Sequence, residues 1–214
     1  ALRPMQGRAC EVAGLRFANP IGLAAGLDKD AQAVSGLSRL GFGHLEVGTV
    51  TPRAQSGNPK PRVFRLEKDT ALINRLGFNN AGIDVLVARL SKQNYQGVIG
   101  VNIGKNKDTP NDAAYRDYVT CIKKAAPVAD YISVNISSPN TPGLRDLAGA
   151  NTILHVIKPV LEARSDLKNR KGAYLPVFVK LAPDFRDANL RQVLEILKEA
   201  SIDAVILTNT TVSR

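Results

Sequence analysis

The chain has 214 residues, of which 44% are hydrophobic and 22% charged, and its formal net charge is +10. This composition is typical of a globular domain and excludes a disordered tail, a collagen-like chain and a coiled coil. No run of about 18 apolar residues occurs, so the sequence predicts no transmembrane helix. The N-terminus lacks an apolar stretch of signal-peptide type. Cys10 and Cys121 are too few for a disulfide framework, which favours a reducing compartment.

The positive charge is dispersed along the chain, with KNRK at 168–171 as the main cluster. An excess of Lys and Arg attracts anions in general, including phosphates, nucleic acid and acidic lipid. Aromatic residues make up only 5% and tryptophan is absent, so stacking platforms for single-stranded nucleic acid are poor. We therefore expect a solvated basic surface and no nucleic-acid partner.

Short apolar runs alternate with longer amphipathic segments along the chain. The runs have the length and content of strands buried on both faces, and they are 20–26, 44–48, 97–104, 130–137, 175–182 and 203–210. The segments between them carry apolar residues at helical spacing, and they are 31–40, 80–90, 111–126, 150–164 and 187–200. Asp187 precedes the apolar stripe of the last segment, so we expect it to cap that helix.

The segment 50–76 departs from this alternation. It contains three prolines, has no helical period and is too long for an ordinary connection between a strand and a helix. We expect it to fold as an inserted hairpin or lid over one end of a single domain spanning 1–214. The alternative interpretation is a solvent-exposed loop without a special role.

The alternation of strands and helices predicts a parallel sheet covered by helices. The first run continues as AAGLDKD rather than GxGxxG, and no GxxxxGK[ST] occurs, which argues against a dinucleotide fold and a P-loop. We therefore expect an α/β fold, the (β/α)8 TIM barrel, with six of its eight strands present. Because two absent strands would leave open edges, we expect the barrel to be incomplete at the C-terminus, with its missing part a separate or disordered segment.

Polar side chains stand at the C-terminal end of each apolar run, and in a barrel these ends meet at one mouth. They are Asp28, Lys29, Thr49, Asn102, Asn135, Ser138, Asn140, Lys180, Thr208, Asn209 and Thr210. The near absence of carboxylates argues against a glycosidase or a di-carboxylate hydrolase. Asparagine amides suit the edge of a flat heterocycle with imide or amide groups. The two lysines suit an anionic carboxylate or an electron-rich cofactor.

Both histidines are interpreted as structural. His44 opens a strand at the opposite end of the barrel, and His155 lies within a helical segment. Neither has a partner at metal-ligand spacing, so we expect no metal site. A Ser-His-Asp triad also lacks a suitable histidine.

The chain resembles the dihydroorotate dehydrogenase family, and in particular its quinone-linked class two. The matching stretches follow the family order over nearly the whole chain, and they are ANPIGLAAGLDKD (18–30), GFGHLEVGTVTPRAQSGNPKPRVFRL (41–66), INRLGFNN (73–80), GVNIGKNKDTP (100–110), SVNISSPNTPGLR (133–145), FVKLAPD (178–184) and TNTTVSR (208–214). Ser138 stands where class one enzymes carry cysteine, which points to class two. The family's later glycine-rich phosphate-binding segments have no counterpart here. Its membrane-associating N-terminal helices are missing or cut short, and residues 1–8 are expected to be their tail.

The resemblance implies FMN-dependent oxidation of dihydroorotate to orotate in de novo pyrimidine (UMP) biosynthesis, with electrons passed to a membrane quinone. It implies a peripheral location at the cytoplasmic face of the cell inner membrane, in contact with anionic lipid. Ser138 resembles the catalytic base. The implied substrate contacts are Lys29, Asn74, Arg75, Leu76, Gly77, Phe78, Asn135, Asn140, Asn209 and Thr210. The implied FMN contacts are Ala25, Gly26, Leu27, Asp28, Lys29, Thr49, Asn102, Asn135, Lys180 and Thr208.

The residues by themselves leave other interpretations open. A lysine inside an apolar strand costs desolvation energy, so Lys180 indicates either a functional group or one member of a structural ion pair. A lysine at the end of a barrel strand also suits a Schiff-base aldolase, although the asparagines fit a planar amide ring better than a sugar phosphate. An inactive barrel fragment is the remaining alternative.

Overall fold

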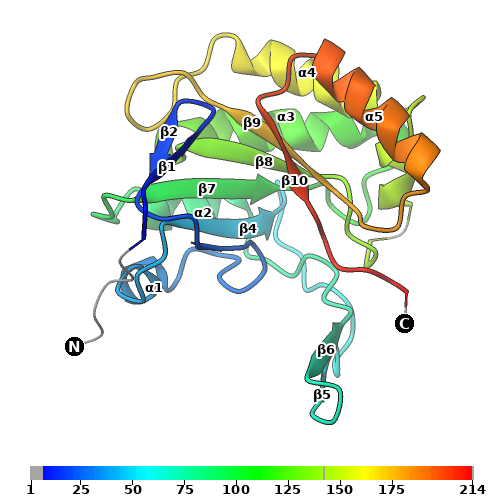
Figure 1. Ribbon diagram of the computed structural model, residues 1–214, viewed down its shortest axis with the longest axis horizontal. Helices are drawn as coiled ribbons and strands as arrows, with labels where there is room; N and C mark the ends of the chain where they lie inside the picture. The colour runs from blue at the N-terminus through cyan, green and yellow to red at the C-terminus, as the bar shows by residue number, and fades with distance from the viewer. Residues whose placement is uncertain (1–6, 142, 214) are drawn as a thin grey trace.

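A six-stranded parallel sheet forms the centre of the computed structural model, which describes residues 7–141 and 143–213 (Figure 1). In spatial order its strands are β3 (Gly22–Leu23), β4 (His44–Val50), β7 (Val98–Ile103), β8 (Tyr131–Asn135), β9 (Val177–Leu181) and β10 (Ala204–Leu207). Each neighbouring pair is parallel. Every strand overlaps one of the predicted apolar runs, so the six predicted strands and the parallel sheet are confirmed.

The helices that connect these strands cover the outer face of the sheet (Figure 1). They are α1 (Val34–Ser38), α2 (Ile83–Leu90), α3 (Ala114–Ala125), α4 (Ile153–Arg164) and α5 (Asp187–Glu199). Three short 3-10 helices add to the connections, and they are η1 (Asn111–Ala113), η2 (Ala126–Val128) and η3 (Leu144–Ala148). Among the described residues, no helix has both the length and the apolar content needed to cross a membrane.

Two helix predictions need correction. The first helix is shorter than the predicted segment 31–40, and Leu40 lies beyond its end with 44% of its surface exposed. Asp187 is the first residue of α5 rather than its cap, because Arg186 precedes the helix with extended backbone and no side chain caps it. The Asp187 carboxylate still lies in the first helical turn, where the helix dipole favours negative charge.

The two faces of the sheet have different chemistry. On β7, Val101 and Ile103 belong to the hydrophobic core shared with the helices, and Tyr118 and Ile122 of α3 pack in the same core. The alternate residue Asn102 points to the inner face, where its side chain forms hydrogen bonds with Thr49, Glu46, Ser133 and Asn135. This alternation follows from the pleat of a strand, and it places polar groups inside the curled sheet.

A small antiparallel hairpin closes the N-terminal end of the inner face. It consists of β1 (Cys10–Val12) and β2 (Leu15–Phe17), and its apolar side chains pack on Tyr131 and Phe178. The rings of Tyr131 and Phe178 stack with centroids 4.6 Å apart, and His44 meets Phe17 edge to face at 5.1 Å. His44 therefore lies at the start of β4, away from the C-terminal mouth, as predicted.

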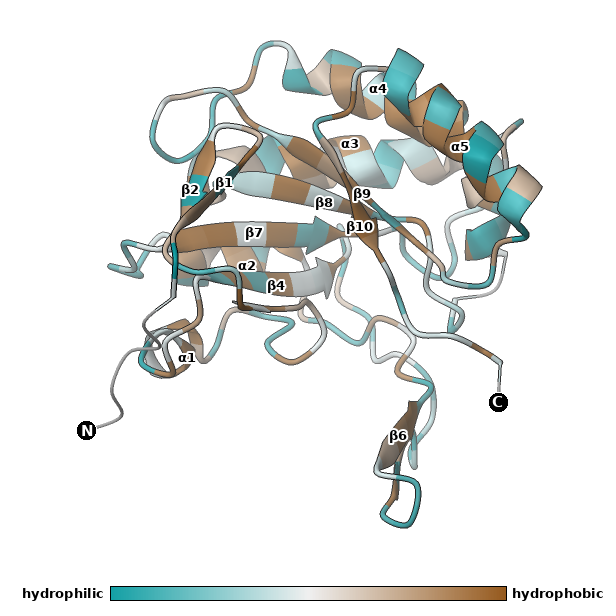
Figure 2. Ribbon diagram, in the orientation of Figure 1, coloured by the Kyte–Doolittle hydropathy of each residue, from teal (hydrophilic) through white to brown (hydrophobic). Residues whose placement is uncertain are grey.

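Part of the segment 50–76 forms a second antiparallel hairpin, which projects from the body of the molecule (Figure 1). Its strands are β5 (Val63–Leu66) and β6 (Ala71–Asn74). Apolar side chains on it are exposed, including Val63 and Leu72, and Figure 2 shows β6 as largely hydrophobic. Its role as a lid stays a prediction. The prediction for residues 1–8 falls mostly outside the described part of the chain.

Candidate active site

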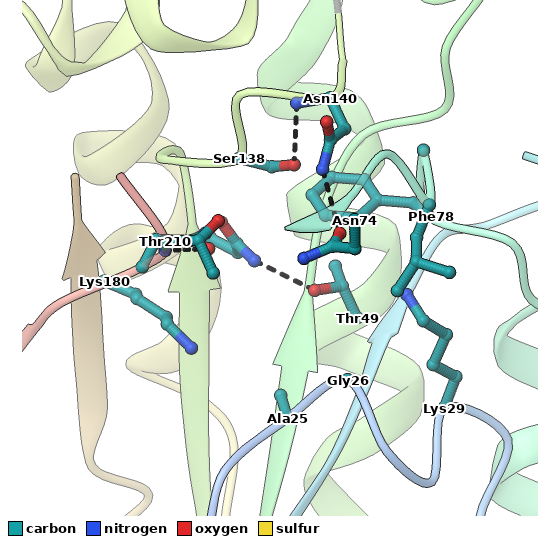
Figure 3. Close-up of a pocket in the computed structure, with 14 residues that line it drawn as sticks. Ala25, Gly26, Lys29, Thr49, Asn74, Phe78, Ser138, Asn140, Lys180 and Thr210 are labelled. Carbon is teal, nitrogen blue, oxygen red and sulfur yellow. Dashed lines mark hydrogen bonds between the residues drawn. The ribbon is translucent and has the colours of Figure 1, made fainter. Parts of the chain in front are cut away.

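A cavity of about 110 Å³ lies at the C-terminal end of the sheet (Figure 3). It is lined by residues from the ends of five strands of the sheet, from the end of β6 and from the chain after β6, and they are Ala25, Gly26, Lys29, Thr49, Asn74, Leu76, Gly77, Phe78, Asn135, Ser138, Asn140, Lys180, Asn209 and Thr210. Every one of these residues was named from the sequence. The structure therefore brings most of the predicted set together, while the role of each residue stays a prediction.

The cavity wall next to β3 is formed by two small residues. Ala25 and Gly26 line the cavity after β3, and the N–H of Gly26 donates to the carbonyl of Gly48 at 2.8 Å. Gly26 has a φ of +118°, and a Cβ placed on it would meet no atom within 4 Å. A glycine is needed for that φ, and it leaves open space against which a flat ligand can lie.

A bulge in β4 turns Thr49 toward the inner face. Gly48 is opposite Asn102 in the sheet register, whereas Val50 is opposite Ile103, so Thr49 is an extra residue. Such a bulge changes the direction of a side chain relative to the regular alternation. The Thr49 hydroxyl donates to Oδ1 of Asn102 at 2.5 Å and accepts from Nδ2 of Asn135 at 2.9 Å.

Lys29 carries its ammonium into a half-buried position at the cavity wall. Burial, together with the positive charge of Arg62, lowers the pKa of Lys29 to about 8, and the charge of Asp30 opposes this shift in part. The ammonium lies 6.0 Å from the centre of the Phe78 ring. At neutral pH the site thus presents a cation whose neighbourhood lacks full compensating charge, which suits an anionic ligand group.

Lys180 is a second cation on the inner face. Only 7% of its surface is exposed, and it also borders a larger cavity of about 440 Å³ inside the curled sheet. In the part of the chain that the structure describes, its ammonium forms no ion pair with a carboxylate. The interpretation of Lys180 as a member of a structural ion pair is therefore not supported.

The loop after β8 places Ser138 over the cavity (Figure 3). Its Oγ accepts a hydrogen bond from the backbone N–H of Asn140 at 3.3 Å, and the side chain is 5% exposed. The carboxamide of Asn140 donates to Oδ1 of Asn74 at 3.1 Å. The carbonyl of Asn140 also accepts from Asn58 at 3.3 Å. The loop is thereby attached to the chain around the projecting hairpin.

Five residues predicted for the site do not line the cavity, and they are Leu27, Asp28, Arg75, Asn102 and Thr208. Leu27 is 70% exposed, and the Arg75 guanidinium donates to the carbonyl of Pro61 at 2.9 Å. The Thr208 hydroxyl donates to the carbonyl of Asn209. Asp28 accepts from the N–H groups of Gln32 and Ala33, each at 2.8 Å, which orders the turn that carries Lys29.

Asn102 lies directly beneath the cavity wall and is fully buried. Its carboxamide contacts Thr49, Asn135, Ser133 and Glu46. It therefore supports two residues that do line the cavity. The contact with Glu46 could not be read from the sequence, since 56 positions separate the two residues and Glu46 is an isolated acid in an apolar run.

Arg145 is another residue that sequence reasoning missed. Its guanidinium donates to the carbonyl of Ser137 at 3.1 Å, to the carboxylate of Asp184 at 2.8 Å and to the carbonyl of Thr210 at 3.0 Å. These three groups belong to the loops after β8, β9 and β10, so Arg145 holds three edges of the mouth together. A charged residue near the strand ends was the only available signal.

Comparisons with known proteins place the chain among enzymes of one family. The family model described as dihydroorotate dehydrogenase matches residues 8–214. A protein of Pseudomonas fluorescens named dihydroorotate dehydrogenase (quinone) is 52% identical over 203 residues, covering 95% of this chain and 60% of the relative. A protein of Alkalilimnicola ehrlichii with the same name is 53% identical over the same shares. The chain thus spans about 60% of the length of these curated relatives.

Solved structures agree with this relationship. The ligand-free dihydroorotate dehydrogenase of Eimeria tenella has a TM-score of 0.92 and 40% identity, covering 100% of this chain and 65% of that one. The same enzyme in complex with ferulenol has a TM-score of 0.89 and 41% identity, covering 96% of this chain and 60% of that one. The likeness confirms the α/β barrel prediction, of which the six parallel strands described above form a part.

Proposed function

Because the chain belongs to the dihydroorotate dehydrogenase family, we propose that the protein containing it oxidises dihydroorotate to orotate in pyrimidine biosynthesis, with FMN as cofactor and a quinone as electron acceptor. The observation that carries this proposal is the cavity at the C-terminal mouth. It combines an amide-rich wall, two lysines and a buried serine hydroxyl, and every lining residue is one that the resemblance to the family predicts for the site. Such a set suits a small, planar, anionic amide.

The residues present fit FMN. The open backbone wall at Gly26 leaves room for a flat ring, and Lys180 supplies a buried positive charge with no carboxylate bound to it among the described residues. We assign the binding of FMN to residues on this side of the site, namely Ala25, Gly26, Lys29, Thr49, Asn135 and Lys180, with Asn102 behind them. When bound, FMN supplies the acceptor for the hydride of the substrate.

The remaining side chains orient the substrate and handle a proton. Lys29 pairs with the substrate carboxylate, and its ammonium is the charged form below a pKa of about 8. A carboxamide carries both a donor and an acceptor for the ring amides, and four asparagines line the cavity, namely Asn74, Asn135, Asn140 and Asn209. They bond to one another and to the backbone in this structure, so the substrate replaces part of these bonds. Oxidation removes a proton from C5 and a hydride from C6, and Ser138 accepts the C5 proton while its own hydroxyl proton passes to solvent water. The N–H of Asn140 on Ser138 Oγ helps to stabilise charge on that oxygen.

The visible spectrum of the purified full-length protein tests the proposal. We expect a bound flavin whose absorbance bleaches on anaerobic addition of dihydroorotate and returns on addition of a quinone. A Lys29→Gln variant loaded with added FMN should need far more dihydroorotate for the same bleaching. A colourless protein that also fails to take up added FMN, or a flavin that dihydroorotate does not reduce, would refute the proposal.

We further propose that the protein acts peripherally at the cytoplasmic face of the inner membrane, where a membrane quinone is accessible. The net charge of +10 in this chain and the exposed apolar side chains Val63 and Leu72 support contact with anionic lipid. Co-sedimentation of the full-length protein with vesicles of neutral and of anionic lipid measures this contact. We expect binding to the anionic vesicles to fall with added salt, and equal binding to both kinds would contradict the electrostatic part.

A further inference from the structure

Glu46 is a buried acid of β4, which does not line the site cavity but lines the larger cavity of about 440 Å³ that Lys180 also borders. Only 5% of the surface of Glu46 is exposed. One carboxylate oxygen accepts from Nδ2 of Asn102 at 2.8 Å, and the other accepts from the Tyr131 hydroxyl at 2.8 Å. Burial and the charge of Glu46 raise the pKa of Tyr131 well above its usual value, so this hydroxyl stays protonated and donates. Both oxygens of Glu46 are therefore used as acceptors.

The hydrogen bonds between Glu46 and the cavity run in one consistent direction. The Asn102 amide nitrogen donates to Glu46, and its oxygen accepts from Thr49 at 2.5 Å and from Asn135 at 3.2 Å. The oxygen of Asn135 then accepts from Asn209 at 3.3 Å. Each carboxamide has a donating NH₂ group and an accepting oxygen. Turning one carboxamide by 180° would therefore place its NH₂ group against a neighbouring donor and its oxygen against a neighbouring acceptor.

Two of these three asparagines are also fixed from the backbone. The N–H of Ser137 donates to Oδ1 of Asn135 at 3.2 Å, and the N–H of Thr210 donates to Oδ1 of Asn209 at 2.8 Å. Asn102 receives no hydrogen bond from a backbone N–H of the described residues. Its amide nitrogen donates only to Glu46 and to the Ser133 hydroxyl at 3.0 Å, and a hydroxyl can accept or donate. Two groups thus decide which way the Asn102 carboxamide points: Glu46 accepts from its nitrogen at 2.8 Å, and Nδ2 of Asn135 donates to its oxygen at 3.2 Å.

We propose that Glu46 is a positioning residue, which helps to fix the carboxamide of Asn102 and thereby keeps the Thr49 hydroxyl, which donates to the oxygen of that carboxamide, in the orientation that receives FMN. This inference rests on the proposed function for its FMN part and on the hydrogen bonds alone for its positioning part. An apolar residue at position 46 would leave one N–H of Asn102 buried without an acceptor. The Asn102 carboxamide would then turn, or the backbone of β7 around it would shift.

Three variants of the full-length protein separate positioning from stability. Glu46→Met removes the acceptor for Asn102, Glu46→Gln keeps one acceptor oxygen for it, and Tyr131→Phe removes the other hydrogen bond to the same carboxylate without touching Asn102. The dissociation constant of FMN, measured by flavin fluorescence on the apoprotein, should rise about tenfold in Glu46→Met, which corresponds to one unsatisfied buried donor. It should change less than about twofold in the other two.

The same comparison in an Asn102→Ala background shows whether Glu46 acts through Asn102. There, Glu46→Met should add nothing to the loss of FMN affinity, because the group that it positions is gone. An equal additional loss in that background, an equal loss in Tyr131→Phe, or no rescue in Glu46→Gln would overturn the inference. If Glu46→Met does not fold, Tyr131→Phe still tests the inference: Glu46 holds Asn102 there and both N–H groups of Asn102 keep their acceptors, so a tenfold loss of affinity would contradict the proposal.

The side-chain amide signal of Asn102 in the nuclear magnetic resonance spectrum of the apoprotein does not depend on a flavin. It is assigned by its disappearance in Asn102→Ala. We expect one sharp signal in wild type, Tyr131→Phe and Glu46→Gln, and a shifted or broadened signal in Glu46→Met. An unchanged signal in Glu46→Met would refute positioning, whereas a changed signal with no FMN affinity in wild type would refute the proposed function instead.

Discussion

Raising the pH from 7 to 9 removes the proton from Lys29, and we expect orotate to bind about tenfold more weakly at the higher pH. The pKa of Lys29 in the free protein is lowered to about 8, first by burial and then by the charge of Arg62. About nine-tenths of the molecules therefore carry the ammonium at pH 7 and about one-tenth at pH 9. If only the ammonium holds the carboxylate of orotate, the apparent affinity falls by the ratio of these fractions.

Titration of the oxidised flavoprotein with orotate, followed by the change in flavin absorbance, gives the dissociation constant at each pH. Lys29→Arg is the matched control, because a guanidinium keeps its charge over this range. Its affinity should be weaker but nearly constant between pH 7 and 9. Lys29→Gln should bind weakly at both values. The reasoning fails if wild type binds equally well at both pH values, or if Lys29→Arg loses affinity to the same extent.

Three further variants test the site and the fold. Ser138→Ala should slow flavin reduction by dihydroorotate at least about a hundredfold in stopped-flow absorbance while orotate affinity changes little, and reduction near the wild-type rate would remove Ser138 as the base. Lys29→Met should stabilise the fold at pH 7 in urea denaturation. The pKa of Lys29 is about 8 in the folded state against 10.5 for a free lysine, so burial of the ammonium destabilises the wild-type fold below pH 8. The wild type regains this stability as the pH rises from 8 toward 10.5. The gain is at most about 3 kcal/mol before solvent screening reduces it, and a loss of stability would contradict the burial argument. Arg170→Met should cost about 3 kcal/mol of unfolding free energy, because it leaves the buried carboxylate of Asp130 without the guanidinium that lies 2.8 Å away. Adding Asp130→Asn should recover part of this loss, and independent, additive losses would argue against the ion pair.

The arrangement of the strands could be predicted because it depends on local sequence. A strand buried on both faces is a short apolar run, and each of the six runs contains one strand of the sheet. The gathering of the site residues follows from the same fact, since the C-terminal ends of neighbouring parallel strands share one edge. Ser138 and Lys180 are 42 positions apart in the chain, yet both line one cavity.

The supports of the site could not be predicted, because they depend on contacts between distant parts of the chain. The pairs Glu46 with Tyr131 and Arg145 with Thr210 lie 85 and 65 positions apart. The bulge that turns Thr49 inward is a register shift between β4 and β7, and a single strand does not encode it. The predicted start of one helix is wrong for a local reason. The helical segment was expected from residue 80, but α2 begins at Ile83, because the Asn80 side chain accepts from the N–H of Gly82 and holds the preceding turn.

The two lysines that line the cavity differ from its asparagines in how their burial is compensated. The asparagines at the mouth satisfy one another and the backbone, so their cost of burial is met inside the chain. Lys29 and Lys180 differ from them: the pKa of Lys29 is lowered, and Lys180 forms no ion pair within the described residues. Two poorly compensated cations cost folding energy, and a bound anion returns it. A site arranged in this way exchanges stability of the free protein for affinity toward the anionic substrate and the flavin that we propose.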